Sequence, residues 1–198
     1  MTFDSLPESA AWRHVGLRDG FEVAFFRAGG RGYFLEGHTS AVEAGRAWAV
    51  HYAIDLDPGW TTREARVTAW ASGAERRTHL RADGEGHWSV DGVPRPELGG
   101  CLDVDLESSA LTNALPVHRL ALAVGGSSAA PAAYVRALDL GVERLEQRYE
   151  RVGDDGALAF DYEAPQFDFR CRLRYDAAGL VVDYPGIATR ASRGRRGR

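Results

Sequence analysis

The stretch FDFRCRLRY, residues 167–175, decides the fold class, because apolar and charged residues alternate along it without interruption. One face carries Phe167, Phe169, Cys171, Leu173 and Tyr175, and the other carries Asp168, Arg170, Arg172 and Arg174. Period-two alternation of this length is typical of an antiparallel strand with one buried face and one solvated face.

Similar alternation recurs along the chain, with turn signals such as Asp57-Pro58-Gly59 between the segments. The further predicted strands are Phe21–Arg27, Trp48–Leu56, Arg66–Ala71, Val117–Val124, Tyr134–Leu140, Glu143–Val152 and Leu158–Glu163. A short helix is predicted over Ser5–Trp12, where Ser5 and Glu8 have the spacing of a capping box, and a helical turn over Ser108–Ala114. We therefore expect a mainly β protein built as an antiparallel curved sheet, a β-roll or half-barrel, with one or two short helices.

Two pairs of segments resemble each other at an offset of about half the chain. Ile54–Leu56 and Arg63–Val67 resemble Leu138–Leu140 and Arg148–Val152 in the same order. Leu80–Gly86 resembles Leu173–Gly179. Two similar β units packed into one roll would explain this echo, and so would chance in a sequence rich in arginine.

Length and charge limit the classes of function. A chain of 198 residues with 44% hydrophobic content can bury a substantial core, and we expect one β-roll domain over residues 1–190. The net charge is −4, although arginines crowd the C-terminus, so the body is acidic. That balance argues against nucleic acid as a partner, and residues 191–198 are expected to be a basic, disordered tail.

The N-terminal stretch Met1–Val15 has neither a basic segment nor an apolar run of the secretory type. Apolar runs elsewhere are shorter than the roughly 18–20 residues that a membrane span needs. These features predict a cytoplasmic protein without a membrane span, in which Cys101 and Cys171 are free thiols in the packed interior. Two cysteines without a CxxC spacing argue against a metal site, and no cofactor is predicted.

Polar residues gather between apolar segments in residues 100–120. In a strand, Asp103 and Asp105 point to the same face, about 7 Å apart. Such a pair can bind a cation, act as acid and base, or accept hydrogen bonds from sugar hydroxyls, and it can equally be an exposed or arginine-bridged pair. Calcium-loop spacing is absent.

Further polar residues stand where packing or a tight turn is expected. Thr112 and Asn113 precede Leu115-Pro116 and fit a capped turn, and Arg119 is placed to face a polar pocket or solvent. A glutamine on a core face, as expected for Gln147, needs hydrogen-bond partners from the protein or from a ligand. Tyr149 shares its face, and Asp183 and Tyr184 lie where an apolar strand ends in a Pro-Gly turn. Aromatic area comes from Tyr33, Phe34, Trp60, Trp70 and Trp88, which serve core packing unless they line a cavity.

Four motifs together resemble the bacterial family of putative glycolipid-binding proteins. They are Gly100–Leu106, Thr112–Leu120, Gln147–Tyr149 and Asp183–Arg190, and Ala110 departs from the pattern, which has proline before the Thr-Asn pair. The resemblance covers nearly the whole chain up to Arg190. It implies a mostly antiparallel β-roll similar to the half-barrel of lipoprotein carriers, with a hydrophobic concavity for a lipid-like ligand.

Two functions of different classes follow. The first is non-catalytic binding of an amphipathic molecule, glycolipid or fatty-acid-like, in a concave β surface. Its candidate ligand-binding residues are Asp103, Asp105, Thr112, Asn113, Arg119, Gln147, Tyr149, Asp183 and Tyr184. The alternative is a hydrolase-type enzyme that uses Asp103 and Asp105, with Arg119 as an anion clamp. The sequence lacks a GxSxG motif and a phosphate loop, which favours binding, and a protein-interaction domain is a third interpretation.

Overall fold

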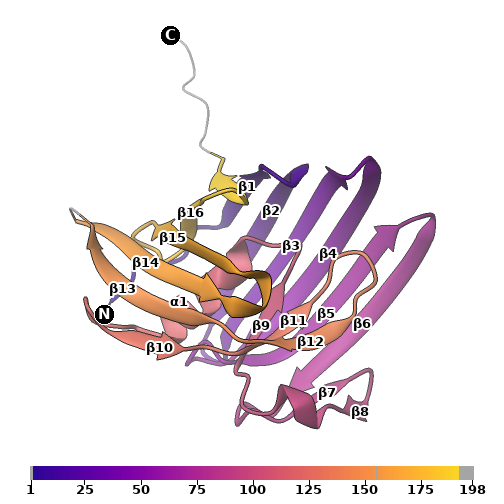
Figure 1. Ribbon diagram of the computed structural model, residues 1–198. Coiled ribbons are helices and arrows are strands. Elements are labelled where there is room, and N and C mark those ends of the chain that lie inside the picture. The colour runs from indigo at the N-terminus through magenta and orange to yellow at the C-terminus, as the bar shows by residue number, and fades with distance from the viewer. Residues whose placement is uncertain (1, 155, 192–198) are drawn as a thin grey trace.

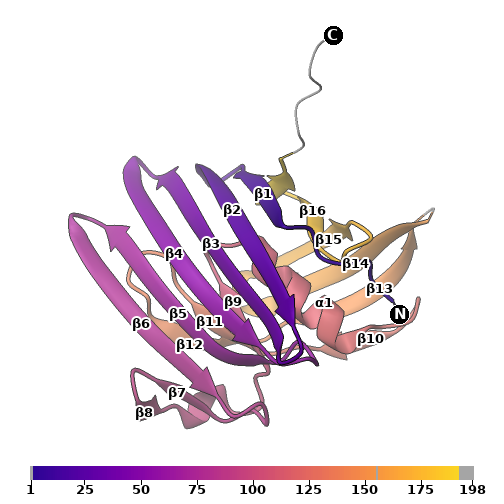
Figure 2. The same ribbon diagram turned by 180° about the vertical axis from the view of Figure 1, so that it is seen from behind.

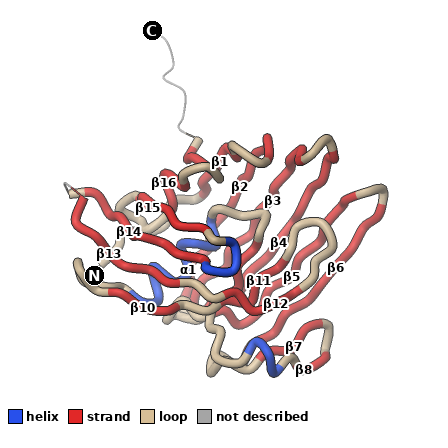
Figure 3. The backbone as a smooth tube through the Cα atoms, in the orientation of Figure 1, coloured by secondary structure: helices blue, strands red, loops and turns tan. Residues whose placement is uncertain are grey.

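The computed structural model describes residues 2–154 and 156–191, and strands dominate it (Figure 3). In the described chain, fourteen strands form one antiparallel sheet in the order β10-β13-β14-β15-β16-β17-β1-β2-β3-β4-β5-β6-β7-β8. Their bounds are β1 Ser9–His14, β2 Arg18–Gly29, β3 Gly32–Glu43, β4 Arg46–Leu56, β5 Thr62–Ala71, β6 Ala74–Ala82, β7 Trp88–Val90, β8 Val93–Pro94, β10 Ser127–Ala129, β13 Arg148–Asp154, β14 Ala157–Ala164, β15 Phe169–Tyr175, β16 Val181–Tyr184 and β17 Ala188–Arg190.

A second, three-stranded sheet has the order β12-β11-β9. Its strands are β9 Asp103–Leu106, β11 Ala132–Val135 and β12 Val142–Leu145, and β9 runs parallel to β11. The helical elements are the α-helix α1 (Ala114–Leu120) and three 3₁₀ turns: η1 (Pro96–Leu98), η2 (Leu111–Asn113) and η3 (Pro165–Phe167).

The large sheet curves without closing, because β10 and β8 form its two separate edges. Strands β2 to β6 make one wall and β13 to β16 make the other (Figure 1). Residues 103–120, which we call the inner segment, carry β9, η2 and α1, and α1 lies between the two walls (Figure 2). The predicted mainly β fold, with an antiparallel curved sheet and short helices, is confirmed.

The predicted alternation of β15 is confirmed in the burial of its side chains. Leu173 and Tyr175 are buried, whereas Arg170, Arg172 and Arg174 are exposed. Phe167 lies outside the strand, in η3, with 53% of its surface exposed. Apolar faces such as this one meet the apolar side of the inner segment, and the two together form the core.

The helix predicted over Ser5–Trp12 is wrong, because Ser9–His14 forms strand β1. Ala10, Trp12 and His14 alternate toward the interior, and Trp12 is fully buried with its indole N–H donating to the Val181 carbonyl at 2.8 Å. Burial of a large aromatic ring outweighs the capping-box signal, whose contribution is about 1 kcal/mol.

The strand predicted over Val117–Val124 is also wrong. Residues 114–120 form α1, in which Ala114, Leu115, Pro116 and Val117 are all buried. A strand with one solvated face would bury every second residue, whereas a helix enclosed on several sides buries consecutive residues. Pro116 is tolerated because it stands in the first turn, where backbone N–H groups lack partners within the helix.

Two more predicted strands are interrupted. Glu143–Val152 is split at Glu146-Gln147 into β12, in the small sheet, and β13, in the large sheet. Tyr134–Leu140 remains a strand only to Val135, after which the chain turns and the Arg136 guanidinium pairs with Asp139. Alternation continues through both breaks in the sequence, and the change of sheet leaves no local signal.

The internal echo is matched in part. Leu80–Gly86 and Leu173–Gly179 both run from a strand end into a turn, and Arg63–Val67 and Arg148–Val152 both lie in strands. By contrast, Ile54–Leu56 is strand and Leu138–Leu140 lies outside any strand. Cys101 is buried and Cys171 is partly buried, and both are free thiols. In the described chain no helix is long and apolar enough to cross a bilayer.

The predicted tail, residues 191–198, lies outside the described residues except for Ala191, whose N–H donates to the Ala11 carbonyl at 2.8 Å. The assignment of residues 1–190 to one domain stays a prediction.

One glycine lets a buried side chain cross the sheet. Tyr52 of β4 reaches over Gly37 of β3, and its hydroxyl donates to the Glu22 carboxylate on β2 at 2.6 Å. A Cβ atom at position 37 would stand 2.3 Å from the Tyr52 ring. The contact therefore requires a residue without a side chain at that point.

Replacing Gly37 by Ala should lower the free energy of unfolding by about 1–3 kcal/mol, because the added methyl group overpacks the Tyr52 ring. Gly29→Ala is the control, since nothing lies within 4 Å of a Cβ atom there. Urea denaturation of both variants measures the effect. We expect the Gly37→Ala cost to shrink in a Tyr52→Leu background, and equal midpoints for the two glycine variants would contradict the clash.

Candidate functional site

A cavity of about 310 Å³ opens between the inner segment, the three-stranded sheet and the wall formed by β14 to β16. It is lined by Leu17, Arg18, Asp105, Leu106, Glu107, Ser109, Asn113, Tyr134, Leu145, Tyr162, Ala164, Phe167, Phe169, Tyr184 and Ile187. Leu17 and Phe167 are 77% and 53% exposed, whereas Asp105, Ser109 and Asn113 are buried. The cavity thus joins exposed apolar side chains to a buried polar end.

Asp105 is the carboxylate at the polar end. Its two oxygens accept hydrogen bonds from the Thr112 hydroxyl at 2.7 Å and the Gln147 amide at 2.5 Å. Burial raises the pKa of Asp105 above its usual range, and these two donors oppose the shift. The amide of Gln147 also donates to the Tyr162 hydroxyl at 3.1 Å, so Gln147 joins the carboxylate to the β14 wall.

Asn113 holds the opposite side of the polar end. Its side-chain oxygen accepts from the Tyr149 hydroxyl at 2.9 Å, and its backbone carbonyl accepts from the Tyr175 hydroxyl at 3.1 Å. Burial raises the pKa of Tyr149, Tyr175 and Tyr184, so these phenols stay protonated at neutral pH. Tyr184 also interacts through its hydroxyl with Asn113 and Tyr162.

Asp103 forms a separate ion pair beside this cluster. The Arg119 guanidinium meets it through two nitrogens, Nε at 3.0 Å and Nη2 at 2.5 Å, and the Asp103 side chain is 2% exposed. Burial raises the pKa of Asp103 and Arg119 opposes the shift. Neither residue lines the cavity, so the pair fixes β9 to α1 and is not available to a ligand there.

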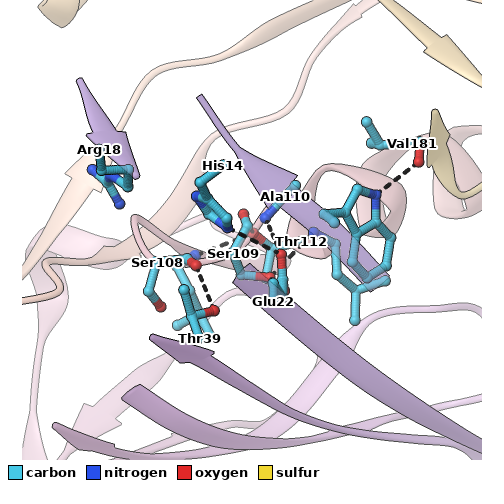
Figure 4. A network of polar contacts seen from close by, with 12 residues as sticks. His14, Arg18, Glu22, Thr39, Ser108, Ser109, Ala110, Thr112 and Val181 are labelled. Atoms are coloured by element: carbon cyan, nitrogen blue, oxygen red, sulfur yellow. Dashed lines mark hydrogen bonds and ion pairs between the residues drawn. The ribbon is translucent and has the colours of Figure 1, made fainter. Parts of the chain in front are cut away.

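A third buried carboxylate attaches the inner segment to the large sheet (Figure 4). Glu22, which is fully buried, accepts from the Ser109 hydroxyl, the Ala110 backbone N–H at 2.8 Å and the Tyr52 hydroxyl at 2.6 Å. The His14 ring lies 3.7 Å from it. The Thr39 hydroxyl donates to the Ser108 carbonyl at 2.8 Å and holds the same turn.

The structure divides the sequence-predicted site residues into three groups. Asp105, Asn113 and Tyr184 line the cavity. Thr112, Gln147 and Tyr149 stand behind it and hold the lining residues by hydrogen bonds. Asp103, Arg119 and Asp183 do not line it, and Asp183 lies in β16 opposite Arg174 and Thr189.

Comparison with known proteins agrees with this architecture. A family model described as "putative glycolipid-binding" matches residues 9–190. The chain belongs to this family. No curated protein matches it.

The solved structures that match this chain include the following two. A DUF1089-family protein from Pseudomonas aeruginosa is 31% identical, with a TM-score of 0.76 over 96% of this chain and 98% of that chain. A beta-barrel-like protein of DUF1849 from Brucella abortus is 11% identical, with a TM-score of 0.49 over 92% of this chain and 93% of that chain.

The sequence did not reveal most of the apolar residues that line the 310 Å³ cavity. Phe169, Ile187 and Leu145 are ordinary residues of strands and turns, and nothing local marks them as cavity residues. Glu22 did leave a signal, because it shares the inward face of β2 with Ala24 and Phe26. Of the tryptophans considered, Trp70 and Trp88 do not line this cavity.

A second cavity, of about 490 Å³, lies beside the N-terminal residues 2–7 and contains none of the predicted site residues. Trp60 lines it, stacked on His118 with ring centroids 3.6 Å apart and an interplanar angle of 5°. Burial lowers the pKa of His118 to about 4, so this aromatic pair is uncharged at neutral pH.

Replacing Arg119 by Gln should lower the free energy of unfolding by about 3 kcal/mol at neutral pH, because Asp103 would be left buried without its cation. The penalty should shrink as the pH falls, because burial raises the pKa of Asp103 and a protonated Asp103 needs no cation. Chemical denaturation at several pH values measures this dependence.

The double variant Asp103→Asn/Arg119→Gln should recover most of that loss. The exposed pair Arg172–Asp161 is the control, and Arg172→Gln should cost about 1 kcal/mol or less. Equal losses in the two arginine variants would show that the buried pair does not fix β9 to α1.

Replacing His118 by Phe should reduce the acid sensitivity of the protein. The pKa of His118 lies below the unfolded value of about 6.5, so wild type loses stability as the pH falls from about 7 through 4. Over that range the wild type should lose roughly 2–3 kcal/mol more than His118→Phe. Thermal or urea unfolding of both proteins across the range measures it, and parallel pH profiles would contradict a buried neutral His118.

Proposed function

We propose that this protein binds one amphipathic, glycolipid-like molecule in the 310 Å³ cavity and does not change it covalently. The observation that carries the proposal is the layout of the cavity. Apolar side chains, among them Phe167, Phe169 and Ile187, surround its outer part, and Asp105, Asn113 and tyrosine hydroxyls form its polar end. An apolar pocket with a few convergent polar groups is typical of a small-molecule site.

The volume limits what can enter. At about 310 Å³ the cavity is at the lower end of the range for ligand pockets. It suits a head group with the adjoining part of one alkyl chain, and the exposed Leu17 and Phe167 then cover the chain where it leaves the pocket. Each buried methylene group contributes about 0.8 kcal/mol.

The environment of the carboxylates favours binding over hydrolysis. The hydrolase alternative needs Asp103 and Asp105 to act together on one substrate. Only Asp105 lines the cavity, and Arg119 occupies both oxygens of Asp103. The family description supports the same choice. We extend the proposal to a bacterial protein of the cytoplasm, the compartment that the unpaired thiols of Cys101 and Cys171 favour.

The test is titration of decyl glucoside, below its micelle concentration, into wild type and two tryptophan variants. Ile187→Trp places a larger ring in the lining and should weaken binding at least tenfold. Val182→Trp is the control, because Val182 is exposed in β16, just before the turn that holds Ile187, and does not line the cavity. Calorimetry or native mass spectrometry measures the affinity.

Binding by all three proteins with the same affinity would place the ligand elsewhere. Failure of the wild type to bind any uncharged alkyl glycoside would overturn the proposal.

A further inference from the structure

The polar end of the cavity carries two carboxyl groups. Asp105 and Glu107 both line it. Asp105 lies in β9, and Glu107 is the first residue after that strand. Both Asp105 oxygens already accept one hydrogen bond each, and a carboxylate has further lone pairs to offer a ligand. The neighbouring Tyr162, Tyr184 and Asn113 are neutral and can bond to a head group of either charge.

Among the described residues that line the cavity, Arg18 is the one cation, and it is already neutralised. Its guanidinium donates to the Glu107 carbonyl at 2.8 Å and lies 3.3 Å from the Glu107 carboxylate and 3.4 Å from that of Glu43. Two carboxylates thus share one arginine. Arg119, the other arginine that the sequence suggested for ligand binding, forms an ion pair with Asp103 and does not line the cavity.

An anionic head group would therefore enter a partly buried site that already holds Asp105, without an available cation. Like charges in a site of low polarity repel strongly, and transferring a carboxylate, sulfate or phosphate from water adds a desolvation cost. A hydroxyl or ammonium group has the opposite character, because it donates hydrogen bonds that a carboxylate accepts.

We propose that this cavity selects head groups that donate hydrogen bonds and carry no negative charge, such as sugar hydroxyls or a primary ammonium, and that Asp105 is the residue that sets this selection. The inference rests on the proposed function, since it concerns the same cavity, and it narrows the class of ligand. Fatty-acid-like ligands, which the sequence had left open, are then excluded, and so are anionic phospholipids.

The experiment compares three amphiphiles with the same chain and different head groups: decyl glucoside, decylammonium and decyl sulfate, each below its micelle concentration. Wild type should bind the glucoside and the ammonium at least tenfold more tightly than the sulfate. Asp105→Asn should weaken glucoside binding by about threefold, because an amide oxygen accepts a hydrogen bond more weakly than a carboxylate. The ratio of ammonium to sulfate affinity should fall at least tenfold in this variant.

Asp183→Asn is the matched control, because it removes the same charge from a residue that does not line the cavity, and it should leave the ratio unchanged. Glu107→Gln is a second test that does not depend on the folding of the Asp105 variant. Its side chain is 29% exposed, and loss of its charge leaves Arg18 paired with Glu43 alone, so the repulsion of an anion falls and the sulfate affinity should rise.

The outcomes separate the two proposals. If wild type binds none of the three amphiphiles, the proposed function fails. If wild type binds decyl sulfate as tightly as decyl glucoside, the cavity is a ligand site and the charge selection is overturned. An ammonium-to-sulfate ratio that stays at the wild-type value in folded Asp105→Asn and in Glu107→Gln would likewise overturn the role of these carboxylates.

Discussion

The buried carboxylate of Glu22 attaches the inner segment to the large sheet, and the cavity depends on that attachment. A fully buried charge is stable only when it is paired and hydrogen-bonded. Glu22 is satisfied by the turn at Ser109-Ala110 and by Tyr52, with His14 close by. Displacing the turn would remove the hydrogen bonds that Ser109 and Ala110 donate to this carboxylate. The inner segment is therefore fixed in its position against the large sheet.

Three buried carboxylates in this region have separate partners and separate consequences. Glu22 fixes the turn before η2, and Asp103 with Arg119 fixes β9 to α1. Asp105, held by Thr112 and Gln147, is the one of the three that lines the cavity. Two charges therefore position the backbone on either side of the third. This arrangement preorganises Asp105 without requiring the ligand to order it.

The sequence predicted what is local and missed what is not. Period-two alternation in Trp48–Leu56 and residues 169–175 comes from one sheet face meeting the core, so it can be read from the chain alone. Gln147 was recognisable because an amide on a core face needs a partner. Helix α1 was missed because burial on several sides removes periodicity, and Ile187 was missed because cavity residues are defined by distant neighbours.

The break at Glu146-Gln147 made the predicted strand Glu143–Val152 wrong, and it also explains why Gln147 is close to the cavity. The chain leaves the three-stranded sheet there and enters the large one, so neither residue belongs to a strand. Gln147 is thereby free to turn its amide toward Asp105 and Tyr162, while its carbonyl accepts from the Ala130 N–H at 2.8 Å. A continuous strand would have placed this backbone in a ladder. Because the two sheets separate at this residue, Gln147 can hold Asp105 at the polar end of the cavity.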